Sequence, residues 1–269
     1  MIKDITIGQY IPGNSFIHKL DPRTKILISL LFIVDLFIIN KFIGYAFVIL
    51  FIGLCVYVSK LSIKYLYKGV KGVFILIIFT AILNVFMIPG TSESLIWEWK
   101  FIHIYREGVS TAVFMALRLI LLIMGTSILT LTTSPIELTD GIERLLKPFK
   151  KIGVPAHELA MMMTIALRFI PTLIDETDKI MKAQKARGAD FETGGIVKKA
   201  KSLIPLLVPL FISSFRRADE LAMAMEARCY RGGEGRTRMK KLVFTTRDAV
   251  AFGAFALLVA SSIYVRVRL

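Results

Sequence analysis

The sequence is poor in the residues that build metal centres, disulfide frameworks and nucleotide sites. It has two cysteines and three histidines among 269 residues. Cys55 lies in an apolar run and Cys229 in a basic segment, so no disulfide framework is expected. The histidines lack a Cys or His neighbour at ligand spacing, which leaves a metal site without support. No Gly-x-x-x-x-Gly-Lys-Ser/Thr phosphate loop occurs, so any energy from nucleotides must be borrowed from another chain.

Acidic residues are also scarce, with 20 Asp and Glu against 35 Lys and Arg and a net charge of +15. No Ser-His-Asp or Cys-His arrangement has supporting context, and the carboxylates of residues 134–247 lie among Lys and Arg as on a solvated face. The basic segment lacks interleaved aromatic residues. Catalysis and nucleic-acid binding are therefore the weaker hypotheses, and the positive charge is better explained by membrane topology.

Apolar residues, in contrast, are abundant. They make up 55% of the chain, and the mean hydropathy is +0.65. Several runs approach the roughly 20 residues that a membrane-crossing helix needs. The predicted spans are 24–39, 42–59, about 72–89, about 108–133 and about 248–265. The first two, separated by Asn40-Lys41, predict a tight hairpin, with one kinked span as the alternative. The predicted fold class is an all-α membrane protein with about five transmembrane helices and a helical cytoplasmic domain.

The distribution of lysine predicts the orientation. Residues 60–71 carry four lysines and no acid, whereas 90–107 carries three glutamates and two tryptophans. Lysine excess marks the cytoplasmic side, and tryptophan favours the membrane interface. The chain then divides into a leader (1–23), four spans (24–133), a cytoplasmic domain (134–247) and a last span with its tail (248–269). Arg266 and Arg268 would lie outside, so either the short tail is tolerated or one span is miscounted.

The cytoplasmic domain has helical periodicity with breaks at Pro148, Gly153-Val154-Pro155, Pro171, Gly194-Gly195 and the run 231–235. Its apolar stretches 159–174 and 203–215 contain Arg168 and two prolines. These stretches are interpreted as interfacial or core helices rather than spans.

A short motif occurs twice in this domain, as Ala186-Arg187-Gly188 and Ala227-Arg228-Cys229. Aligned on the arginines, Asp178 matches Asp219 and Ala183 matches Ala224. One such arginine would be an ordinary helix C-terminal residue. Two occurrences with matched neighbours favour a functional role, because the guanidinium fork suits an interface. The pair predicts a partner with two equivalent grooves.

Three further features have two interpretations. Met161, Met162 and Met163 are either core filling or an adaptable docking surface. Asp35 and Arg118 lie within apolar runs, where charges are costly and usually paired or functional. They either extend to the outer interface or form a mutual ion pair.

The chain resembles the transmembrane scaffold subunits (EcfT, or CbiQ in cobalt systems) of energy-coupling-factor importers. The resemblance depends on three motifs in order: the leader His18-Lys19-Leu20-Asp21-Pro22-Arg23-Thr24-Lys25, then Arg168-Phe169-Ile170-Pro171, then the two Ala-Arg motifs. It extends along nearly the whole chain. The second Ala-Arg motif commonly reads Ala-Arg-Gly in this family, so Cys229 departs from it and leaves the cap geometry open.

The resemblance implies two coupling helices that dock into two ABC-type ATPases through residues 186–188 and 227–229. It also implies a separate membrane subunit that captures a vitamin or metal ion, touched by the apolar helices 159–174 and 203–215. Its implied contacts include Met161, Met162, Met163, Leu206, Leu210 and Phe211. ATP and Mg would be bound by the ATPases, and this chain would hold no cofactor. The expected location is the cell membrane, with the N-terminus and 134–247 cytoplasmic.

The alternative is a self-contained secondary transporter or channel. It would need a conduction path of intramembrane polar residues, and only Asp35, Asn84 and Arg118 offer one.

Overall fold

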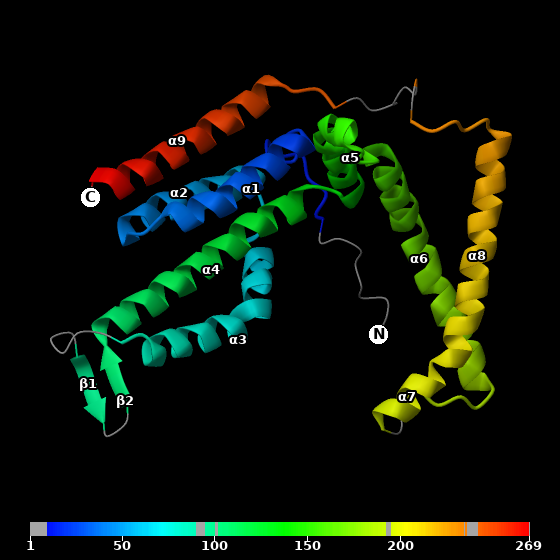
Figure 1. The fold of residues 1–269 in the computed structure, drawn as a ribbon, viewed down its shortest axis with the longest axis horizontal. Coiled ribbons are helices and arrows are strands. Elements are labelled where there is room, and N and C mark those ends of the chain that lie inside the picture. Colours follow the sequence, from blue (N-terminus) through cyan, green and yellow to red (C-terminus); the bar gives the residue numbers. More distant parts are fainter. Residues whose placement is uncertain are drawn as a thin grey trace. The chain divides into compact units, whose positions relative to one another are not determined.

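The structure is a computed structural model that describes residues 10–89, 95–99, 102–191, 195–233, 235 and 242–268. These residues fall into two compact units, one formed by 8–141 with 242–269 and the other by 142–241. Both units are mainly helical, and the strands found in the described ranges form one short hairpin (Figure 1).

The first unit is a helical bundle. It contains α1 (Pro22–Ile38), α2 (Phe42–Ser59), α3 (Ile63–Met87), α4 (Arg106–Thr132) and α9 (Thr246–Arg268). Helix α4 packs against α3 and also against α1 and α2, which in turn pack against α9 (Figure 1). Only three residues separate α1 from α2, and residues 25–32 of α1 and 51–58 of α2 line one cavity, so the chain turns back between the two helices and they run antiparallel. They form the predicted hairpin rather than one kinked span.

Helix α1 begins two residues earlier than the predicted span. Asp21 is its N-cap, and the Arg23 amide donates a hydrogen bond to Oδ1 of Asp21 over 2.9 Å. Pro22 occupies the first turn, where its missing N–H costs nothing. Asp21-Pro22, assigned from the sequence to the leader (1–23), is therefore a helix start.

The bundle buries a small apolar core and exposes the rest of its hydrophobic surface. The core contains residues of α1, α2, α4 and α9, namely Phe32, Leu36, Ile39, Tyr45, Val48, Ile52, Leu121, Phe255 and Leu258. Outward residues remain open, such as Leu50 at 71%, Ile75 at 83% and Leu257 at 74% exposure. An exposed apolar surface of this extent is typical of a lipid-facing bundle.

Five of the described helices are long and apolar enough to cross a membrane, namely α2, α3, α4, α6 (Ala156–Ala186) and α9. This confirms the predicted fold class. The set differs in one member from the predicted spans. Helix α1 has 17 residues and is about 25 Å long, short of the roughly 30 Å hydrocarbon core. Helix α6, predicted to be interfacial or buried, meets the length and composition criteria.

A β-hairpin that the sequence analysis missed connects α3 to α4. Strands β1 (Leu95–Trp99) and β2 (Ile102–Tyr105) are antiparallel, with Trp97 opposite Ile104 and Trp99 opposite Ile102. β-branched and aromatic residues on both sides of a two-residue connection are the sequence signal for such a hairpin. The segment had been interpreted only as an outer loop.

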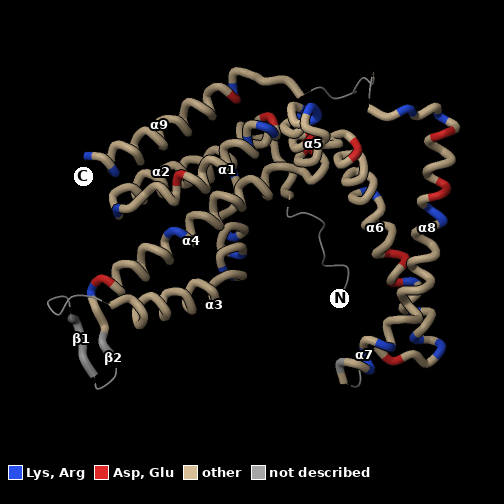
Figure 2. The backbone as a smooth tube through the Cα atoms, in the orientation of Figure 1, with Lys and Arg blue, Asp and Glu red and all other residues tan. Residues whose placement is uncertain are grey.

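The second unit is dominated by two long helices. After α5 (Pro135–Leu146), which spans the unit boundary, come η2 (Lys147–Ile152), α6, α7 (Ile196–Ser202) and α8 (Ile204–Ala227). Helices α6 and α8 pack together. The Gln184 side chain of α6 donates a hydrogen bond to the Pro205 carbonyl of α8. Glu176 of α6 accepts hydrogen bonds from Ser213 and Arg217 of α8. Residue numbers rise along α6 as they fall along α8, so the pair is antiparallel. Charged residues are frequent on this pair and sparse along α2 and α9 (Figure 2).

The predicted break at Pro171 is wrong, because α6 continues through it to Ala186. Proline removes one hydrogen bond from the helix interior and normally kinks or ends it. Here α6 is held on both sides of Pro171. Before it, His157 contacts the loop that follows α8. After it, Glu176 and Gln184 bond to α8. These tertiary contacts hold the two halves in one helix. The predicted breaks at Pro148 and Gly153 coincide with η2 and its end, whereas Gly194 lies outside the described residues.

Candidate functional site

The two Ala-Arg motifs end α6 and α8 with the same hydrogen-bond pattern. At the end of α6, the Gly188 and Ala189 amides donate to the carbonyls of Lys185 and Gln184, both over 3.0 Å. At the end of α8, the Cys229 and Tyr230 amides donate to Glu226 and Met225 over 2.8 and 3.0 Å. Both are Schellman motifs, which satisfy the last free carbonyls of a helix. The sequence repeat is thus a structural repeat.

Cys229 adopts the backbone conformation that Gly188 adopts. Its φ is 54°, and that of Gly188 is 87°, both in the left-handed region. Glycine enters this region freely, whereas a residue with a Cβ does so at a cost. The replacement of glycine by cysteine therefore preserves the cap geometry, which the sequence had left open.

The caps present both arginines to the surroundings. Arg187 and Arg228 are the C-cap residues, and both are exposed, as are Ala186 and Ala227 before them. Because α6 and α8 are antiparallel, the two caps lie at opposite ends of the pair (Figure 1). Helix α8 has 24 residues, which places the caps on the order of 36 Å apart at 1.5 Å per residue. Such a spacing suits two separate binding events better than one small ligand.

Arg228 lines a cavity of about 560 Å³ between α6, α8 and the loop after α8. Arg168 and Arg231 line the same cavity, together with Met161 and Met225. No carboxylate occurs among its described lining residues, and no ion pair to these three arginines is found in the described ranges. The structure thus brings Arg168 of the Arg-Phe-Ile-Pro motif to the second Ala-Arg motif. A cluster of three arginines of this kind attracts an anionic partner.

A histidine fixes the loop that follows the second cap. Nδ1 of His157 is 3.1 Å from Oε1 of Glu143, and Nε2 is 3.2 Å from the Tyr230 hydroxyl. Gly233 lies against the imidazole, where an added Cβ would come within 2.4 Å of the ring. In the sequence, His157 has no Cys or His neighbour at ligand spacing. Its partners are 14 and 73 positions away, so no local spacing could reveal them.

A polar network joins the middle of the two long helices. Glu176 on α6 accepts hydrogen bonds from Ser213 and Arg217 on α8, the second over 2.6 Å. The Arg217 and Glu176 side chains are 33% and 21% exposed. These bonds connect the middle of α6 to the middle of α8.

The apolar residues predicted to contact another subunit fall into exposed and buried groups. Met162, Met163 and Phe211 are exposed, and Phe211 packs edge-on against Phe215. Met161 and Leu210 are half-buried. Leu206 is buried at 5% exposure, so its side chain packs inside the unit and does not reach the surface. The exposed stripe on α8 consists of Leu203, Ile204, Leu207, Val208, Phe211, Ile212 and Phe215.

The two charges within the apolar runs have separate partners, so the predicted ion pair is wrong. Asp35 is buried and accepts a hydrogen bond from the Ser262 hydroxyl of α9 over 3.1 Å. Arg118 donates to the Tyr45 hydroxyl and the Ile39 carbonyl, each over 3.1 Å. That carbonyl follows the last turn of α1 and has no helical partner to accept from. Asp35 also does not extend to the interface, because α9 covers it.

The leader motif ties three elements together at one end of the first unit. Oδ1 of Asp248, in the first turn of α9, accepts from the Asp21 amide over 2.9 Å. Lys25 donates to the carbonyls of His18 and Thr132 over 3.2 and 2.9 Å, linking the leader to the end of α4. The motif therefore joins α1, α4 and α9, and Asp248 is a member that the sequence analysis missed.

These features define a multi-pass helical membrane protein that carries a pair of antiparallel, arginine-capped helices. The family model described as cobalt transport protein (CbiQ) matches residues 13–239. The energy-coupling factor transporter transmembrane protein EcfT of Clostridium kluyveri is 68% identical over 99% of this chain and 98% of its own length. The EcfT protein of Thermosediminibacter oceani is 63% identical over 98% of this chain and 99% of its own length. That of Bacillus subtilis is 47% identical over 99% of this chain and 100% of its own length. The chain belongs to this CbiQ/EcfT family of transmembrane energy-coupling components of transporters.

Proposed function

We propose that the caps of α6 and α8 dock into two ABC-type ATPase subunits, one cap in each. The chain then transmits ATP-driven motion to a separate membrane subunit that captures a vitamin or a transition-metal ion for uptake. The observation that carries this proposal is the pair of matched caps at opposite ends of one antiparallel helix pair. Two equivalent surfaces tens of ångströms apart suit two equivalent partners.

The chemistry of each cap supports a protein groove with acidic residues as its target. An exposed guanidinium at the end of a capped helix presents its fork of donors on a rigid support. The alanine before it leaves room for close approach. At the second cap, Arg168 and Arg231 add charge to the same surface. An acidic groove would be held by charge-assisted hydrogen bonds.

Motion would pass from the caps to the exposed apolar stripe on α8. The bridge between Glu176, Ser213 and Arg217 stiffens the helix pair between its two ends. A displacement of either cap would then move the stripe as part of one body. The stripe and the exposed Met162 and Met163 would contact the capture subunit.

ATP and Mg would be bound by the ATPases in this scheme, because this sequence has no phosphate loop. The chain would span the cell membrane with its N-terminus and residues 134–247 in the cytoplasm. The exposed lysines at positions 64, 68 and 71, at the beginning of α3, support this orientation (Figure 2).

Copurification tests the docking. The chain is tagged and coexpressed with the ATPases encoded in the same cell, and the double variant Arg187→Glu with Arg228→Glu is compared with Arg216→Glu. Arg216 is an exposed arginine of α8 outside both motifs. We expect the double variant to insert in the membrane and lose both ATPases, while Arg216→Glu retains them. Retention of the ATPases by the double variant would refute the docking.

A further inference from the structure

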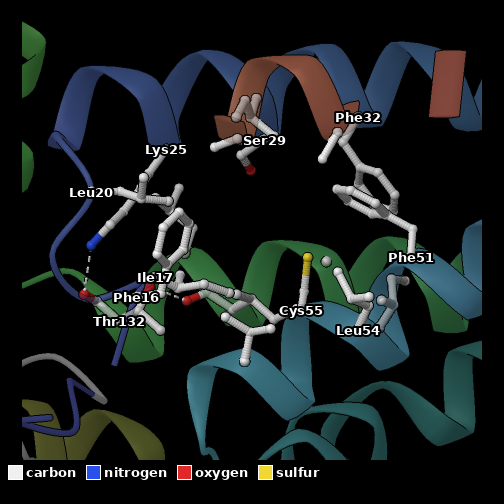
Figure 3. A pocket seen from close by; sticks show the side chains of 18 of the residues that line it. Phe16, Ile17, Leu20, Lys25, Ser29, Phe32, Phe51, Leu54, Cys55 and Thr132 are labelled. Carbon is white, nitrogen blue, oxygen red and sulfur yellow. Dashed lines mark hydrogen bonds between the residues drawn. The ribbon is translucent and has the colours of Figure 1, made fainter. Parts of the chain in front are cut away.

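The first unit contains an apolar cavity of about 420 Å³ between the leader segment and helices α1, α2, α4 and α9 (Figure 3). We propose that it holds one acyl chain of an anionic phospholipid, with the head group near the ammonium of Lys25. The proposal rests on the membrane orientation proposed above and is independent of the docking of ATPases.

The lining of the cavity favours a hydrocarbon occupant. Phe16, Ile28, Phe32 and Phe51 are among its apolar walls. The described polar lining residues are Lys25, Ser29, Cys55 and Thr132, and Figure 3 shows Ser29 and Cys55 pointing into the space from opposite sides. An ordered water needs two to four polar partners, and apolar cavities stay dry. Water is therefore a poor occupant.

The size of the cavity indicates that it is filled. The cavity is partly open to the outside of the bundle, so a molecule from the surroundings can enter it, and unfilled space along its walls would forfeit packing contacts. A volume of about 420 Å³ is in the range of ligand pockets, roughly 300–1,000 Å³. For a helical bundle whose outer surface faces the bilayer, the apolar filler at hand is a lipid chain.

The charge at one end of the cavity selects the head group. Lys25 is the one charged side chain among the described lining residues. Its ammonium has three N–H donors, and two are used by the carbonyls of His18 and Thr132. Its side chain forms no salt bridge within the described ranges. The carboxylates of Glu137, Asp248 and Asp21 act on this ammonium through space without bonding to it, so its third N–H donor is open to an anionic group. A lipid phosphate at the cytoplasmic end, where anionic lipids gather, supplies one.

The experiment uses the full chain purified in detergent and mixed with equal amounts of phosphatidylglycerol and phosphatidylcholine bearing identical acyl chains. After removal of excess lipid, native mass spectrometry counts what each chain retains. The filling variant is Ala254→Phe, which places a ring in the cavity. The matched control is Ala256→Phe, two residues further on the same helix and exposed.

We expect the wild type to retain about one phosphatidylglycerol, favoured about fivefold over phosphatidylcholine, as one lysine near an anionic lipid would give. Ala254→Phe should lose this lipid, and Ala256→Phe should keep it. Equal retention of both lipids by the wild type, or undiminished retention by Ala254→Phe, would overturn the proposal. If Ala254→Phe does not fold, Ser29→Leu serves as a smaller filling variant. The preference of the wild type for phosphatidylglycerol over phosphatidylcholine then still decides whether the proposal holds.

Discussion

Exchanging the residues at the two caps tests whether the left-handed position controls each helix end. Gly188 and Cys229 occupy equivalent positions, and both have positive φ. An added Cβ at Gly188 would meet nothing within 4 Å, so Gly188→Ala changes the backbone energy without changing packing. A left-handed residue with a Cβ costs roughly 1–2 kcal/mol, partly offset by the smaller entropy that alanine loses on folding. We expect Gly188→Ala to destabilise the last turn of α6 by about 1 kcal/mol.

The reverse exchange should have the opposite sign. Cys229 is exposed, so Cys229→Gly removes the strain without removing buried contacts. We expect the last turn of α8 to gain about 0.5–1 kcal/mol. Cys229→Ala is the control, because it keeps the Cβ and should change little.

Amide hydrogen exchange measures both effects, because local opening reports the stability of each helix end. The informative amides are those of Ala189 and Tyr230, which donate the bonds that close the caps. A change of about 1 kcal/mol corresponds to roughly fivefold in exchange rate. Faster exchange at Ala189 in Gly188→Ala and slower exchange at Tyr230 in Cys229→Gly are the expected pair. Unchanged rates in both variants would show that the left-handed residue does not control the caps.

Three further predictions concern the remaining polar contacts. Ser262→Ala removes the hydroxyl that donates to buried Asp35, and it should lower the free energy of unfolding by about 1–3 kcal/mol. The control is Ser261→Ala, whose hydroxyl bonds within its own helix and which should leave the thermal unfolding unchanged. Equal effects of the two variants would contradict the prediction. The swap Asp35→Arg with Arg118→Asp should not rescue expression lost in the single variants, because the two residues have separate partners; rescue would restore the ion-pair hypothesis. Gly233→Ala should displace the His157 ring, seen as a shift of its NMR signals, whereas Gly195→Ala, with nothing within 4 Å, should leave it in place.

Features decided by neighbouring residues were predictable from the sequence. The apolar runs located α2, α3, α4 and α9, since span length and composition are local properties. The Ala-Arg repeat located the ends of α6 and α8, and the glycine at 188 identified the first cap. The cysteine at 229 obscured the second cap, because residue preference alone does not predict a strained left-handed residue.

Features decided by distant contacts were not predictable. Asp35 meets Ser262 across 227 positions, and His157 meets Tyr230 across 73. Pro171 has the local chemistry of a helix break, but packing against α8 overrides it. The ion pair between Asp35 and Arg118 was inferred because charges within apolar runs are costly and usually paired, and the structure instead satisfies each one with a hydroxyl or carbonyl group. Depth within an apolar run identifies costly residues without identifying their partners.

The bond from the Asp21 amide to Asp248 has a consequence for how the protein is made. Synthesis reaches Asp21, at the start of α1, 227 residues before it reaches Asp248, whose carboxylate accepts from the Asp21 amide. Until Asp248 is synthesised, the helices already inserted in the bilayer lack this acceptor for the Asp21 amide. The bond between the start of α1 and the start of α9 therefore forms only after residue 248 has been synthesised, and a nascent chain stalled before that residue would lack it.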